Sequence, residues 1–261
     1  MISPLLAAAL SALLSMAGWR ARFLTPSGAG AAFAVGLSVL AGTGWAGGAV
    51  LAAFFLSSST VSRLTESRQS RRLDPKGNRR DPWQVAANGG AAAVGGLVGW
   101  LSGEAGLWIV TASLTAAASD TWATSLGALS RRDPVDIVRW RRVPTGASGG
   151  VSIAGTLGGL AGAALVAGTA VVAGGPASLF LPAVALGMTG MVADSVLGAT
   201  VQGRFHCPSC GMDTERRRHR CGAVTEHTGG WQWLGNDGVN ALATGLAGCA
   251  AAGWWAWACC S

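Results

Sequence analysis

Apolar residues occur in long blocks along the chain, and short polar or basic stretches separate these blocks. A membrane-spanning helix needs about 20 consecutive, mainly apolar residues. Eight windows of about that length are found, at 3–19, 26–44, 46–62, 84–101, 106–129, 148–173, 178–202 and 236–257. The pattern therefore predicts an all-α, polytopic transmembrane helix bundle of about eight spans, which forms a single membrane domain over 1–261.

Composition agrees with lipid as the solvent of this bundle. Only 12% of the 261 residues are charged, whereas a soluble domain has about 25%. The mean hydropathy is +0.41. The chain has 40 glycines, and small residues allow membrane helices to approach closely, so Gly-rich packing is expected. A signal peptide is the alternative for 3–19, but no basic stretch precedes this window and Arg20 and Arg22 follow it.

The distribution of positive charge predicts the orientation of the chain in the membrane. All 19 Lys and Arg residues follow the first, third, fifth or seventh window. By the positive-inside rule, the connections that carry them face the cytoplasm. We therefore expect a multi-pass protein of the cell (inner or plasma) membrane with both termini on the non-cytoplasmic side.

Two acids interrupt the apolar windows. Asp120 lies eleven residues before Arg131, and Asp194 lies ten before Arg204, so both fall in the cytoplasmic half of the membrane. An ionisable residue at this depth is by default a functional hypothesis. The alternative for a single acid is a structural role, in which Ser, Thr or Arg from a neighbouring helix satisfies the carboxylate.

Further polar residues are expected at the same level. Asn236, Asp237 and Asn240 open the eighth window, and Asn88 opens the fourth. Three acids repel one another unless a cation lies between them. Asp120, Asp194 and Asp237 are therefore predicted to be catalytic and to hold Mg²⁺, whose ligands commonly include substrate phosphates.

Glycine-rich helix starts face the same compartment. A helix N-terminus binds anions, and glycine lets an anion approach the backbone, although glycine in membrane helices also serves packing. The predicted polyphosphate contacts are the amides and hydroxyls of Asn88, Thr121, Ser148, Asn236 and Asn240, the backbone of Gly149 and Gly150, and the charges of Arg79, Arg80, Arg131 and Arg204.

An internal repeat is suggested by two pairs of similar segments. "ASDTWATSLGA" (118–128) resembles "VADSVLGATVQ" (192–202), and "NGG" at 88 resembles "NDG" at 236. Chance similarity in a chain of low complexity is the alternative.

The connection over 203–235 is predicted to be a cytoplasmic loop with a zinc-binding cluster. Cys207 and Cys210 form a C-x-x-C pair, and Cys221 follows. Structural zinc takes four N or S ligands, so His219 would complete the set, with His206 and His227 as alternatives. Reduced thiols without metal are the other interpretation.

Five motifs together resemble a family of integral membrane proteins, the domain of unknown function 92. They are "QVAANGG", "AAASDTWATSLG", "TGASGGVSIAGT", "VADSVLGATVQGRF" followed by "CPSC", and "WLGNDGVNALAT", in this order. The family includes the plant phytyl phosphate kinase, which is similar to CTP-dependent phytol and dolichol kinases. It generally has Asn where Ser148 stands and often has Asn where Asp237 stands.

The resemblance implies an enzyme that transfers a phosphoryl group from CTP, or another nucleoside triphosphate, to a polyprenyl or phytyl-type monophosphate. The expected partners are the bilayer, this lipid phosphate and the nucleotide, and no nucleic acid. The alternatives are a cytidylyltransferase acting on a lipid phosphate, a lipid or small-molecule transporter, and a scaffold whose zinc loop recruits a partner.

Overall fold

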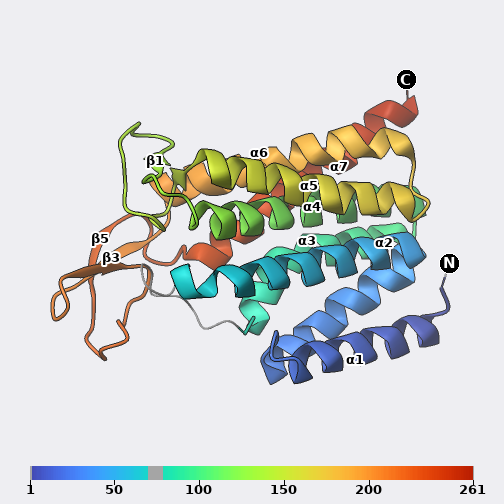
Figure 1. Ribbon diagram of the computed structural model, residues 1–261. Coiled ribbons are helices and arrows are strands. Elements are labelled where there is room, and N and C mark those ends of the chain that lie inside the picture. The colour runs from blue at the N-terminus through green and yellow to red at the C-terminus, as the bar shows by residue number, and fades with distance from the viewer. Residues whose placement is uncertain (1, 70–78, 261) are drawn as a thin grey trace.

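The computed structural model describes residues 2–69 and 79–260, and within these ranges the chain is mostly helical (Figure 1). Seven α-helices occur in the described part: α1 Pro4–Arg20, α2 Pro26–Gln69, α3 Pro82–Gly99, α4 Gly103–Gly127, α5 Ile153–Val172, α6 Phe180–Thr200 and α7 Asn236–Cys260. A 3₁₀ turn, η1 Ala177–Leu179, precedes α6.

Short strands, which an all-α interpretation does not include, occur in two loops. β1 Val135–Asp136 pairs antiparallel with β2 Gly150–Val151. A second sheet has the order β4-β3-β5 and consists of β3 Arg204–Cys207, β4 Met212–Thr214 and β5 Glu226–Gly229. Both sheets lie at one end of the bundle (Figure 1).

Helix α2 contains a break that makes it two segments. Gly44 has φ +68° and ψ −151° inside the helix, a left-handed φ that glycine adopts without steric cost. Figure 1 shows α2 running to one end of the bundle and returning. The predicted windows 26–44 and 46–62 thus correspond to the two segments of α2.

Each of the other six windows overlaps one helix, but the number of helices that cross the bilayer stays a prediction. By length and apolar composition, three candidate spans occur among the described residues: Pro26–Thr65, Ile153–Val172 and Ala177–Thr200. The internal repeat also remains a prediction.

The two ends of the bundle differ in charge. Both termini lie at one end, and the two sheets lie at the other (Figure 1). The connections between helices at the terminal end, around Gly44, 100–102 and 173–176, carry no Lys or Arg. The sequence therefore places basic side chains at the end that carries the sheets.

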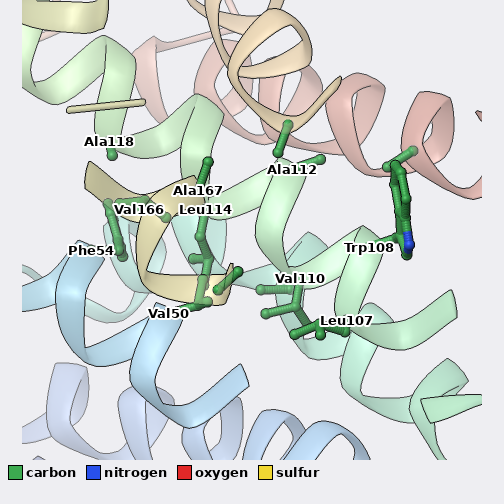
Figure 2. Close-up of a cluster of buried hydrophobic side chains, with 14 of the residues drawn as sticks. Val50, Phe54, Leu107, Trp108, Val110, Ala112, Leu114, Ala118, Val166 and Ala167 are labelled. Carbon is green, nitrogen blue, oxygen red and sulfur yellow. The ribbon is translucent and has the colours of Figure 1, made fainter. Parts of the chain in front are cut away.

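Helix α4 is the centre of the bundle. Every residue from Ala105 to Ser119 is buried, because α4 packs against α2, α3, α5, α6 and α7. Figure 2 shows Leu114 of α4 in the same apolar cluster as Val50 of α2 and Val166 of α5. A helix that is buried on all sides needs apolar or small residues on all sides, which is the composition of α4.

Glycine contacts bring the helices close together. A Cβ on Gly96 of α3 would lie 2.7 Å from the backbone nitrogen of Val39 in α2. A Cβ on Gly106 of α4 would lie 2.7 Å from the carbonyl oxygen of Gly95 in α3. Close approach of this kind is how membrane helices gain packing energy without a hydrophobic driving force.

Candidate functional site

A cavity of about 150 Å³ lies where α4, α5 and α6 meet the loop between α4 and α5. Six of the residues predicted from the sequence line it: Asp120, Ser148, Gly149, Gly150, Asp194 and Asn236. They come from segments far apart in the chain, so the fold brings them together.

The two acids reach the cavity from different helices. Asp120 is the first residue of α4 after the continuous buried run from Ala105 to Ser119, and Asp194 belongs to α6. The Oδ2 atom of Asp194 is buried and has no hydrogen-bond partner among the described residues. Asp194 also interacts electrostatically with Asp120 and with Glu215. Neighbouring carboxylates of this kind favour a bound cation.

A glycine loop also lines the cavity. Gly149 has φ +83°, and a Cβ there would lie 2.9 Å from the Cα of Ala199 in α6, so only glycine fits this backbone position without strain. Ser152 caps α5 by accepting the N–H of Gly155 at 3.1 Å. The N-terminus of α5 therefore opens beside the cavity, where its dipole favours negative charge.

Asp136 attaches this loop to α6. Its Oδ1 accepts the backbone N–H groups of Val138 at 2.9 Å and Arg139 at 2.7 Å. Its Oδ2 pairs with the Arg139 guanidinium at 3.0 Å, which also donates to the carbonyl of Ala199 at 3.1 Å. The hydrogen bond from the Arg139 backbone is the main cause that lowers the pKa of Asp136.

We expect Asp136→Asn to lower the unfolding free energy by about 1–3 kcal/mol at neutral pH, because it weakens charge-assisted hydrogen bonds at a buried site. The folded-state pKa is lowered, so the stabilisation is complete above the ordinary aspartate pKa of about 4 and is lost as the pH falls through the folded value. Thermal unfolding midpoints in detergent should therefore differ between wild type and variant at pH 7 and begin to converge only below about pH 4.

Asp133→Asn is the matched control for this prediction, because Asp133 is an exposed acid in the same loop. A gap between wild type and Asp136→Asn that stays constant down to acid pH would contradict the argument.

Two further residues of the cavity were not predicted from the sequence. Gln202 is 2% exposed, and its Nε2 has no hydrogen-bond partner among the described residues. Glu215 lies at the exposed mouth, where its Oε1 accepts the Ser148 hydroxyl. Nothing in their local sequence separates them from other polar loop residues, because only the tertiary fold brings them to the cavity.

Four predicted residues are not among the described residues that line the cavity. The Thr121 hydroxyl donates to the carbonyl of Ala117 within α4. Asn88 of α3, and Asp237 and Asn240 of α7, are half-buried and are not among the described residues that line the cavity. Thr244 of α7 donates to the Ala87 carbonyl at 2.9 Å, so α3 and α7 lie side by side where these residues occur.

The four predicted arginines are also not among the described lining residues. Arg79 and Arg131 are exposed, and Arg204 opens β3. The Arg80 guanidinium lies 5.2 Å from the Phe54 ring centroid, and burial lowers its pKa to about 10.

The loop over 203–235 contains a Cys₃His cluster that could bind a metal such as zinc. The ligand atoms of Cys207, Cys210, His219 and Cys221 all lie within 4.8 Å of one another. The Cys207 and Cys221 sulfurs are 3.6 Å apart, and His219 Nδ1 is 3.2 Å from the Cys221 sulfur. Three thiolates and one imidazole are a common structural zinc set, and the hydrogen bond from His219 is the main cause that lowers the pKa of Cys221 to about 6.

Comparison with known proteins finds a family of integral membrane proteins. The family model "Integral membrane protein DUF92" matches residues 9–248. Protein PGR of Arabidopsis thaliana is 31% identical, over 88% of this chain and 88% of that protein. An uncharacterized membrane protein of Synechocystis is 28% identical, over 89% and 83%, and one of Methanocaldococcus jannaschii is 31% identical, over 58% and 63%. No solved structure matches the chain.

Proposed function

The chain belongs to this DUF92 family of integral membrane proteins, and on that premise we propose that it is a membrane-embedded phosphotransferase. It moves the γ-phosphoryl group of CTP, or another nucleoside triphosphate, to a polyprenyl or phytyl-type monophosphate at the cytoplasmic face. The proposal rests on the resemblance to the family that includes the plant phytyl phosphate kinase, together with the chemistry of the cavity.

The observation that carries the proposal is the composition of the cavity wall. Its lining includes the carboxylates of Asp120 and Asp194 together with the loop Ser148–Gly150 and the start of α5. Carboxylates suit Mg²⁺, and backbone N–H groups beside a helix N-terminus suit phosphate oxygens. A polyphosphate with its cation needs both kinds of group.

The buried amide of Gln202 also supports an anionic ligand. Its Nε2 is a hydrogen-bond donor without a partner among the described residues, and leaving such a donor unpaired costs about 1–3 kcal/mol. A phosphate oxygen in the cavity would accept this hydrogen bond.

The reaction is a transfer from one phosphate oxygen to another. The bond between the γ-phosphorus and the bridging β,γ-oxygen breaks, a bond forms between the γ-phosphorus and an oxygen of the lipid phosphate, and CDP leaves. The acceptor is already an anion, so no general base is required. Catalysis is then a matter of positioning and charge stabilisation.

Each lining residue has a role in this proposal. Mg²⁺ held by Asp120 and Asp194 would offset the negative charge of the phosphates, while Gly149, Gly150 and Ser148 orient the donor. Asn236 and Gln202 would contact the remaining phosphate oxygens. The isoprenoid chain would lie between Gly-rich helices, in lipid.

A labelling experiment tests the proposal directly. The purified protein is incubated in detergent with Mg²⁺, phytyl monophosphate and CTP labelled at either the α- or the γ-phosphorus. Transfer of the γ-label alone to the lipid supports the phosphotransferase. Transfer of the α-label instead identifies the cytidylyltransferase, and no transfer to any isoprenyl monophosphate with any nucleoside triphosphate overturns both.

A further inference from the structure

Glu215 connects the Cys₃His cluster to the cavity. Its carboxylate lines the cavity mouth and accepts a hydrogen bond from Ser148. In the chain it lies between Cys210 and His219, so metal ligands hold the segment on both sides of it. The position of this carboxylate therefore depends on how that segment is folded.

The loop has a small apolar core of its own. Within 203–235 the buried side chains are those of Phe205, Cys207, His219 and Leu234, and two of these four belong to the Cys₃His cluster. A segment of this length with so small an apolar core normally requires a metal or disulfides to fold. Metal binding then supplies folding free energy.

The two clusters suit different metals. The loop offers thiolates and an imidazole, which zinc prefers, whereas the cavity offers the carboxylates of Asp120, Asp194 and Glu215, which magnesium and manganese prefer. All three acids line the same cavity, so a cation among them would remove their mutual repulsion.

We propose that zinc bound by the Cys₃His cluster holds Glu215 at the cavity, where its carboxylate joins Asp120 and Asp194 in a divalent-cation site. The inference rests on the proposed function only in taking the cavity as a magnesium site. Glu215 takes the place that the sequence suggested for Asp237 as third acid. Zinc acts here at a distance, by positioning a ligand for a second metal.

The experiment measures metal binding rather than turnover. Zinc content is determined by mass spectrometry, and Mn²⁺ affinity of the zinc-loaded protein is determined by electron paramagnetic resonance in detergent. Glu215→Gln should retain zinc and lose Mn²⁺ affinity by about 10-fold, the usual cost of altering a contact of a metal site. Cys210→Ser should lose zinc and show the same loss of Mn²⁺ affinity.

The double variant Glu215→Gln/Cys210→Ser is decisive. If zinc acts through Glu215, the second change adds no further loss, because residues that act through one another are not additive. Additive losses, or a Cys210→Ser variant that keeps wild-type Mn²⁺ affinity, would overturn the inference. Glu226→Gln is the control, because Glu226 is an exposed acid of β5 in the same loop.

Two further arms separate the outcomes. If Cys210→Ser does not fold, zinc is removed from the wild type with a chelator and then restored, and Mn²⁺ affinity must fall and recover with it. Strong Mn²⁺ binding that depends on Asp194 and Glu215, without phosphoryl transfer, would leave this inference intact and overturn the proposed function.

Discussion

Asp194→Asn is expected to abolish phosphoryl transfer and to leave the helix bundle at least as stable as the wild type. The carboxylate is proposed to hold Mg²⁺, so its loss should lower the rate by about 10³-fold, or about 4 kcal/mol of transition-state stabilisation. The Oδ2 atom is buried without a hydrogen-bond partner among the described residues. A neutral amide costs less to bury in lipid than a carboxylate, so we expect the unfolding free energy to rise by about 1–2 kcal/mol.

The combination of effects separates a functional acid from a structural one. Transfer of the γ-label and the thermal unfolding midpoint are measured on the same detergent-solubilised samples, with Asp120→Asn expected to behave alike. Glu104→Gln is the matched control for Asp120, because Glu104 is an exposed acid in the first turn of the same helix, α4. An Asp194→Asn variant that is less stable yet still transfers phosphate would assign the acid a structural role.

Gly149→Ala is expected to displace the glycine loop from α6 and to eliminate ligand binding in the cavity. The backbone has φ +83°, which costs an L-residue roughly 1–2 kcal/mol. The new Cβ would also lie 2.9 Å from the Cα of Ala199, whose carbonyl accepts a hydrogen bond from Arg139 of the same loop. We expect a total loss of stability of about 2–4 kcal/mol, read from thermal unfolding.

Gly174→Ala isolates the backbone contribution to this effect. Gly174 has φ +98°, and nothing lies within 4 Å of the Cβ that would be added, so this variant has the strain without the clash. It lies after α5 at the end of the bundle away from the cavity. Equal losses of stability in the two variants would show that the contact with α6 is unimportant.

The helix pattern could be predicted from the sequence because each segment carries its own signal. The apolar windows mark the helices, and Gly44 divides two of them as expected from the boundary near residue 45. Strands β1 and β2 could not be predicted, because they have two residues each. A strand this short has no sequence pattern of its own and forms only when the folded loop brings the two segments together. The Cys₃His set could be predicted, because its ligand spacing is local.

Some cavity residues could be predicted from their local sequence, and others could not. Asp120 and Asp194 interrupt apolar windows, so their polarity alone identifies them. Glu215 and Gln202 lie among other polar residues, and their proximity to the cavity depends on how the loops fold back. Asp237 was predicted at the level of the two acids and is not among the described residues that line the cavity, so its role stays a prediction.

The central position of α4 has a consequence for biogenesis. Five other helices contact it, and three of these, α5, α6 and α7, are synthesised after it. Its hydroxyl-bearing residues Thr111, Ser113, Thr115 and Ser119 are all buried in the folded protein. During synthesis, these hydroxyl groups therefore stay exposed to the translocon or to lipid until the C-terminal half of the chain has been inserted. Chains that end before α7 would therefore expose this unfinished surface and become substrates for membrane quality-control proteases.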